Sequence, residues 1–128
     1  MDLLLDTNAL LWALTGDDRL GDAASSIADR RNRVYVSAVS AWEIAIKCSL
    51  GKLSVPPNLV KWLPEELTEA QFTPLPITIN HALQVENLPR HHTDPFDRLL
   101  IAQALHEKLV IVTGDSQFTS YDVRIIRC

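Results

Sequence analysis

The stretch Leu3-Leu4-Leu5-Asp6-Thr7-Asn8 opens the chain with three consecutive leucines that end on a carboxylate. A strand built from these leucines has no polar face, so both of its sides must be buried, as in the centre of a parallel α/β sheet. Asp6 then lies at the carboxyl end of the strand, the edge where open α/β sheets bind their ligands. Thr7 or Asn8 is expected to cap the helix that follows. From this stretch alone, Asp6 is equally well explained as a helix cap or as a functional residue.

Similar short strands recur along the chain, separated by stretches with helical periodicity. Apolar runs predict strands at residues 34–36, 109–113 and 123–126, and prolines mark a weaker edge strand at residues 75–77. Helices that separate short buried strands predict an α/β three-layer sandwich with a central parallel sheet of four to five strands. The 128 residues, 47% of them apolar, are enough for a single domain at residues 1–128.

Capping residues and prolines predict where the helices begin and end. The expected signals are Asp17 or Asp18 for a helix through residues 23–31, Ser37 or Ser40 for a helix that stops at Gly51, Asn58 for residues 59–63, and Pro64 for a restart through residue 70.

The best-marked helix begins at Asp94-Pro95-Phe96-Asp97 and runs to Leu105. Asp94 occupies the N-cap position, Pro95 the first helical position and Asp97 the third, which is a typical helix start. Two adjacent histidines, His91 and His92, lie in the polar loop before it, and the sequence indicates no partner for either.

Four carboxylates occupy the same kind of position in this predicted fold. Asp6 ends one strand, Asp115 follows another, and Glu43 lies in the helix after the second strand. Strand carboxyl ends and helix amino ends share one edge of a parallel sheet, so these three belong together. Asp97 joins them if the loop at residues 88–93 returns the chain to that edge. Because four gathered anions repel one another, the sequence predicts a bound cation, and carboxylate oxygens suit Mg²⁺ or Mn²⁺.

Each of these acids also has a structural explanation. Asp94 and Asp97 are typical of a helix first turn, and Asp94 is interpreted first as a cap and only second as a ligand. Glu43 has Lys47 four residues later and could form a surface ion pair. Asp115 stands in a Gly-Asp turn. The four together are more specific than any one, and they indicate metal-dependent phosphodiester hydrolysis.

Charge and composition limit the other possibilities. The formal net charge of −4 argues against a nucleic-acid binder that relies on charge alone, although bound metal ions could reverse the local sign. Cys48 and Cys128 lie far apart and form no disulfide framework, which favours a reducing compartment. The chain shows no basic leader and no long apolar span, so we expect a cytoplasmic protein without a signal peptide or membrane helix.

Four motifs resemble those of PIN-domain ribonucleases and, more closely, of the VapC toxins of bacterial type II toxin–antitoxin systems. They follow one another in the expected order over nearly the whole chain, and the run from Asp94 to Ala104 is the most specific. The motifs are Leu3–Asn8, Val36–Ile44, Asp94–Ala104 and Val112–Asp115.

The resemblance implies a Mg²⁺- or Mn²⁺-dependent endoribonuclease that inhibits translation until a cognate antitoxin neutralises it. It assigns metal-binding and catalytic roles to Asp6, Glu43 and Asp97, with Asp115 as the fourth acid. It also implies that Asn8 lines the same pocket and that Thr113 helps to orient water. A homodimer, and a higher complex with the antitoxin, would be the assembly. Besides the resemblance, the basic residues near this edge are candidates to contact the RNA backbone, although solvation or a surface ion pair explains each of them as well: Arg98, Arg90, His91, His92 and Lys47.

Two other functions are compatible with parts of the sequence. A phosphatase of the haloacid dehalogenase kind also begins with a strand that ends in Asp, but it needs a second Asp where this chain has Asn8. A PIN-like module that binds RNA or a partner without cutting would be expected to lack one or more acids, yet all four are present. Nuclease activity is therefore the favoured hypothesis.

Overall fold

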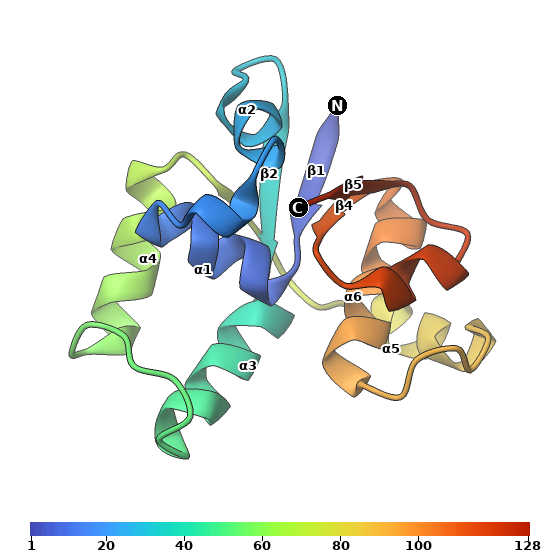
Figure 1. Cartoon of the computed structure of the whole chain (residues 1–128). Helices are drawn as coiled ribbons and strands as arrows, with labels where there is room; N and C mark the ends of the chain where they lie inside the picture. Colours follow the sequence, from blue (N-terminus) through green and yellow to red (C-terminus); the bar gives the residue numbers. More distant parts are fainter.

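The computed structural model describes residues 1–128, and a five-stranded sheet occupies its centre (Figure 1). The order across the sheet is β3-β2-β1-β4-β5, and every neighbouring pair is parallel. The predicted α/β fold with a parallel sheet is thus confirmed, with β3 two residues earlier than predicted and β5 two residues later. The strands are β1 (Asp2–Leu5), β2 (Arg33–Ser37), β3 (Thr73–Leu75), β4 (Val110–Thr113) and β5 (Ile125–Arg127).

The leucines of β1 are buried on both faces of the sheet, as the opening stretch predicts. Leu3 and Leu5 belong to one apolar cluster and Leu4 to another, and all three are fully inaccessible to solvent. Alternate residues of a strand point to opposite faces, so a strand covered on both sides must be apolar throughout. Strand β1 therefore divides the core into two layers.

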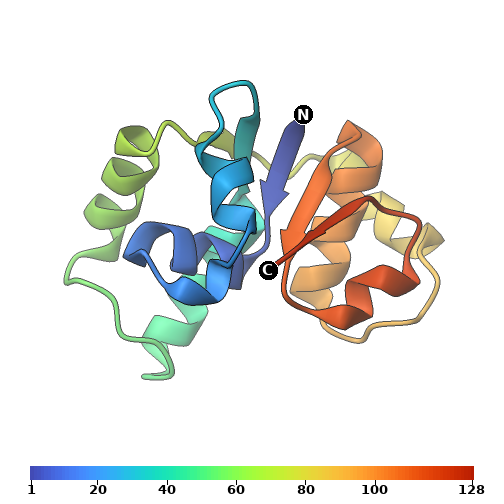
Figure 2. The same ribbon diagram turned by 45° about the horizontal axis from the view of Figure 1, so that its top comes forward.

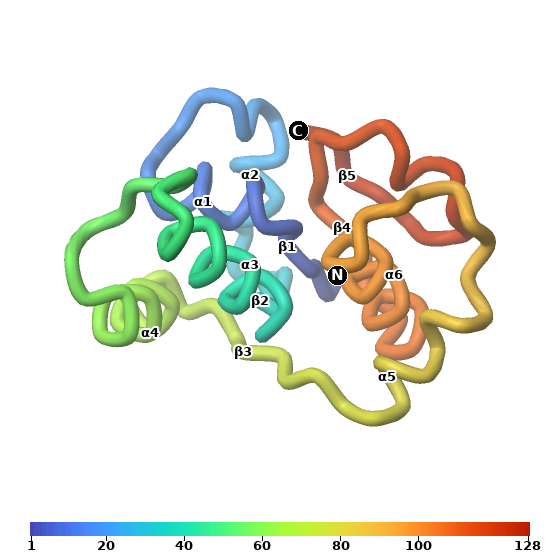
Figure 3. The backbone as a smooth tube through the Cα atoms, turned by 90° about the horizontal axis from the view of Figure 1, so that it is seen from below, coloured from blue at the N-terminus to red at the C-terminus, as the bar shows by residue number.

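Helices cover both faces of the sheet and complete the three layers (Figures 2 and 3). The cluster around Leu3 and Leu5 includes residues of the first four helices, and the cluster around Leu4 includes much of the last helix. One side carries α1 (Thr7–Thr15), α2 (Ala23–Ala28), α3 (Ala38–Ser49) and α4 (Leu59–Glu69), and the other carries α5 (Ile79–Gln84) and α6 (Pro95–Glu107).

The strand order reverses direction between β1 and β4. The chain builds outward from β1 through β2 to β3, then crosses back through α5 and α6 and adds β4 on the other side of β1. In open α/β sheets, the carboxyl edge at such a switch point is where ligands bind. The amide of Asp6 still pairs with the carbonyl of Val112, 3.1 Å away, so Asp6 lies directly at this switch point.

Several predicted helix boundaries were wrong. Asp6 itself caps α1, because its Oδ1 accepts the amide of Ala9 at 2.8 Å, and neither Thr7 nor Asn8 is the cap. The helix expected through residue 31 ends at Ala28, and Asp17 caps only a short 3₁₀ turn at Asp18–Leu20.

The predicted boundaries of α3 agree with the structure better than those of α4. Ser37, not Ser40, caps α3, and Gly51 has the positive φ that a residue just beyond a helix end adopts. Asn58 precedes α4 but makes no side-chain capping bond, and α4 continues through Pro64 without a break. The apolar contacts of Leu63 and its neighbours with the core outweigh the missing proline hydrogen bond.

A buried amide links the layers beneath α6. Gln103 is fully buried, accepts a bond from the Ser37 hydroxyl, and donates to the carbonyl of Pro76 at 3.2 Å. The same amide lies 3.3 Å from Nδ1 of His81, which also accepts the amide of Thr78 in a capping box at the start of α5. These bonds fix α6 relative to β2 and α5, and with them the position of the amino end of α6.

None of the helices combines the length and the apolar character that crossing a membrane would require.

Candidate functional site

Asp6 is the innermost acid of the site. Its side chain is only 6% exposed because β1 ends beneath helices on both sides. Burial raises the pKa of Asp6 above its ordinary value, and the negative charges of Asp115 and Glu43 raise it further. The Thr113 hydroxyl and the amide of Ala9 act in the opposite direction. The structure therefore places Asp6 within electrostatic reach of two of the other predicted acids.

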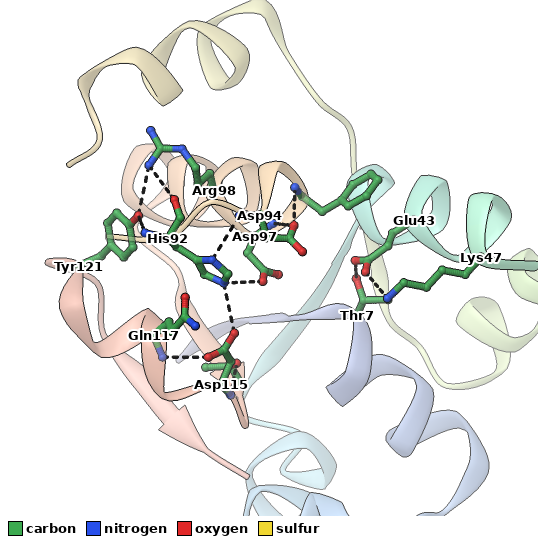
Figure 4. Close-up of polar contacts among 12 residues, drawn as sticks. Thr7, Glu43, Lys47, His92, Asp94, Asp97, Arg98, Asp115, Gln117 and Tyr121 are labelled. Carbon is green, nitrogen blue, oxygen red and sulfur yellow. Dashed lines mark hydrogen bonds and ion pairs between the residues drawn. The ribbon is translucent and has the colours of Figure 1, made fainter. Parts of the chain in front are cut away.

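Glu43 is held by one neighbour on each of its two oxygens (Figure 4). The Thr7 hydroxyl donates to Oε1 at 2.6 Å, and Nζ of Lys47 lies 2.6 Å from Oε2. Glu43 is buried, so the pair with Lys47 is not the solvated surface pair that its spacing alone would allow. Thr7, next to Asp6 in sequence, thus ties the start of α1 to α3 at the position of an acid.

Asp97 and Asp115 meet at the imidazole of His92 (Figure 4). Nε2 of His92 lies 2.9 Å from Oδ2 of Asp97 and 3.2 Å from Oδ2 of Asp115. The loop before α6 therefore does return the chain to the carboxyl edge of the sheet, which Asp97 needed in order to join the other acids. The ligand atoms of these three residues lie within 4.8 Å of one another.

The environment of Asp97 is strongly unfavourable to its charge. Burial raises the pKa of Asp97 to about 7, with further contributions from the charges of Asp94, Asp6 and Glu43, while His92 lowers it. Burial and like charges act together only where acids are gathered out of water. Lys47 beside Glu43 and His92 beside Asp97 and Asp115 are the basic side chains in contact with these acids, fewer than the acids themselves. The remaining negative charge, on carboxylate oxygens, fits a hard divalent cation.

The remaining predicted residues take different places. Thr113 is fully buried at the end of β4, where its hydroxyl accepts the amide of Asp115 at 3.0 Å. Asn8 is exposed in the first turn of α1. Asp94 caps α6 by accepting the amides of Phe96 and Asp97, as predicted, and its charge acts on Asp97.

Arg98 is directed away from the acids and holds the loop that precedes α6 (Figure 4). Its guanidinium donates to the carbonyls of Pro89 at 2.8 Å and Val85 at 3.1 Å, and to the hydroxyl of Tyr121 at 3.2 Å. The structure thus gives Arg98 a role in the conformation of the loop, and the RNA contact expected from its charge stays a prediction.

A second cluster of possible ligands, His81 with His106 and Glu107, lies at the other end of α6. Nδ1 of His81 accepts the amide of Thr78, so its proton resides on Nε2, which faces Glu107 at 2.9 Å. A ring nitrogen that carries a proton is not free to bind a metal ion. We therefore regard this cluster as a helix cap with a hydrogen bond to Glu107.

A hollow of about 570 Å³ in the surface lies at the opposite edge of the sheet from the acids. It is lined at the amino ends of β1, β2 and β3, and it includes Arg30, Arg31 and Arg33. Arg31 is paired with Asp29 at 2.8 Å. This hollow brings no group of acids together and is separate from the candidate site.

His92 is the residue of the site whose partners and role among the acids the sequence did not identify. Its position in a polar loop carries no periodicity, and its partners lie 5 and 23 residues away along the chain. The one available signal was its place two residues before the Asp94 cap, because the same loop had to return Asp97 to the sheet edge.

Known protein families and proteins resemble this chain in sequence. The model of one family, the PIN domain, matches residues 3–124. Ribonuclease VapC22 of Mycobacterium tuberculosis is 29% identical over 120 residues, which cover 93% of this chain and 91% of that protein. Ribonuclease VapC16 of the same organism is 35% identical over 65 residues, or 51% of this chain, and the matched part spans only 45% of that protein.

A solved structure of VapBC2 from Rickettsia felis, bound to a DNA fragment from its promoter, contains a chain of the same fold. The TM-score is 0.75 at 16% sequence identity, and the match covers 99% of this chain and 98% of that chain. At such low identity the likeness concerns the fold alone.

Proposed function

Because the chain belongs to the PIN domain family, we propose that it is a metal-dependent endoribonuclease and the toxin of a type II toxin–antitoxin pair. The observation that carries the proposal is the convergence of Asp6, Glu43, Asp97 and Asp115 at the switch point of the sheet. Membership of this family argues against the haloacid dehalogenase alternative.

We assign the four acids to the binding of Mg²⁺, with Mn²⁺ as a substitute. Asp6 follows β1 directly, Glu43 and Asp97 come from α3 and α6, and Asp115 comes from the segment after β4. A bound divalent ion supplies charge stabilisation for the phosphodiester and activation of water. The side chains of Thr7 and Lys47 hold Glu43, and Thr113 holds the amide of Asp115, so the ligand positions are set by further hydrogen bonds.

The proposed substrate is RNA, which Asn8 and Arg98 would help to bind. The names of VapC16 and VapC22 describe ribonucleases, and this similarity supports nuclease activity here. A module that binds without cutting is the second candidate, and the retention of all four acids argues against it.

We further propose a cognate antitoxin as partner, a homodimer that could form a larger complex with it, and action in the cytoplasm to inhibit translation. The structural likeness to a chain of the Rickettsia felis VapBC2 complex supports the antitoxin partner. Several large apolar side chains remain exposed on this chain, including Trp42, Ile79 and Leu83, and they are available for such contacts.

Incubation of purified protein with total RNA tests the proposal. Cleavage is expected with Mg²⁺ or Mn²⁺ and is expected to disappear with a chelator. The Asp6→Asn variant should be inactive although its helix cap is preserved, because Asn caps a helix as well as Asp but is a poor ligand for hard cations. The exposed Asp122→Asn variant is the matched control and should cleave like the wild type. Equal inertness of wild type and Asp6→Asn with every metal would favour the binding module.

A further inference from the structure

We propose that His92 is a positioning residue that spaces two of the metal-binding carboxylates: its Nε2 donates a hydrogen bond to Asp115 and lies against Asp97. The inference rests on the proposed function, since it concerns the same site. It goes beyond that function because none of the sequence motifs assigns a role to this histidine.

One nitrogen of His92 serves both acids. Nε2 lies 2.9 Å from Oδ2 of Asp97 and 3.2 Å from Oδ2 of Asp115, and the ring is 9% exposed. Asp97 belongs to α6, whereas Asp115 belongs to the connection between β4 and β5. His92 is therefore the group through which these two separate parts of the chain are joined at the site.

The hydrogen bonds of the ring identify it as a donor. Nδ1 accepts the amide of Asp94 at 3.3 Å, so in the neutral ring the proton resides on Nε2. An Nε2 that carries its proton donates to carboxylates and does not bind a metal ion. His92 thus organises the ligands of the site and is not itself one of them.

The backbone of His92 is held through both its amide and its carbonyl. The amide of His92 donates to the Tyr121 hydroxyl at 2.9 Å, and the Arg98 guanidinium donates to that hydroxyl and to the carbonyl of His92. The ring also packs edge-on against Phe118, with 6.1 Å between ring centroids. Tyr121 and Phe118 both follow Asp115 in sequence, so the same contacts fix the backbone of the loop and of the Asp115 segment.

This arrangement leaves oxygens of both acids for a cation. His92 uses Oδ2 of each carboxylate, and Oδ1 of Asp115 accepts the amide of Gln117 at 2.9 Å. A carboxylate oxygen accepts more than one bond, so these contacts orient the carboxylates without exhausting them. Removal of a group that orients metal ligands in this way typically lowers the metal affinity by about 10- to 100-fold.

Calorimetric titration of the full chain with Mn²⁺ tests the proposal with three variants. His92→Ala is expected to weaken Mn²⁺ binding by about 10- to 100-fold. His92→Gln keeps an N–H donor of similar reach and is expected to recover most of the affinity. Arg90→Ala, an exposed neighbour in the same loop, is the matched control and is expected to bind Mn²⁺ like the wild type.

A metal-free measurement keeps the test independent of activity. Nitrogen NMR of the ring is expected to show the Nε2–H form of His92, with a ring proton signal that changes in Asp97→Asn. An Nδ1–H form, or a His92→Ala variant that binds Mn²⁺ as tightly as the wild type or more tightly, would overturn the positioning role alone. A wild-type protein that binds no Mn²⁺ would overturn the proposed function as well.

Discussion

At the scale of single residues, capping and metal binding are compatible uses of the same carboxylate. Asp6 caps α1 and Asp115 caps the 3₁₀ turn at Ser116–Ser120, each through Oδ1. From the sequence alone the two roles were alternatives, because capping and metal binding each explain an acidic residue at the start of a helix. In the structure, one oxygen fixes the side chain, which makes the carboxylate a better ordered ligand.

The raised pKa of Asp97 makes a prediction about the metal-free protein. Its pKa is about 7 in the folded state, against about 3.9 in an unfolded chain. Folding therefore favours the protonated form, and stability is lost as the pH rises from about 4 to about 7. Asp97→Asn removes this loss and should be more stable than the wild type at pH 8, by about 1–2 kcal/mol after allowance for solvent screening.

Urea unfolding in the presence of a chelator, at pH 5 and pH 8, measures the effect of Asp97→Asn. The advantage of the variant should shrink markedly at pH 5, and the variant should bind Mn²⁺ weakly or not at all. Asp122→Asn is the exposed control, with no expected change at either pH. An Asp97→Asn advantage that is the same at both pH values would show that the charge of Asp97 is not the cause.

At the scale of elements, the loop before α6 decides whether Asp97 reaches the site. The guanidinium of Arg98 donates to five acceptors in and around this loop, which are the carbonyls of Val85, Leu88, Pro89 and His92 and the hydroxyl of Tyr121. A planar group with several fixed donors can satisfy such a set, whereas the single ammonium of lysine cannot.

Arg98→Lys is therefore expected to loosen the loop while the charge is retained. Hydrogen bonds to these exposed and partly buried carbonyls contribute about 0.5–1.5 kcal/mol each, so the variant should unfold more easily and the amide of His92 should exchange with solvent faster. Hydrogen exchange and urea unfolding provide the two readouts, with the exposed Arg124→Lys as control. Unaltered exchange at His92 in Arg98→Lys would mean that the loop holds its shape without the guanidinium.

The elements also show where sequence reasoning succeeds. Strands β1 and β4 and helix α6 were predictable because uninterrupted apolar runs and a complete set of capping residues act locally. The path of α4 through Pro64 and the end of α2 at Ala28 depend on packing against distant residues, which a local pattern does not contain. The role of His92 in the site was likewise not predictable from a local pattern, because the tertiary fold brings its partners to it.

At the scale of the whole molecule, the topology of the sheet determines where the acids gather. Strand order reverses between β1 and β4, and the acids that end or follow these strands are Asp6 and Asp115. Glu43 and Asp97 arrive from helices on either side of the sheet. The general rule for parallel sheets therefore predicted the position of Asp6, Glu43 and Asp115, whereas the position of Asp97 depended on the path of the loop before α6. The contacts that hold the acids, such as Thr7 to Glu43, emerged only from the structure.

Anomalous diffraction from crystals grown with Mn²⁺ tests the central claim most directly. The account predicts one or two strong peaks between Asp6 and Asp97, with Glu43 and Asp115 bound directly or through water, and no such peak in Asp6→Asn crystals. Absence of a peak at these acids in the wild type, or a peak only at the His81, His106 and Glu107 cluster, would contradict the claim that the four carboxylates share a cation.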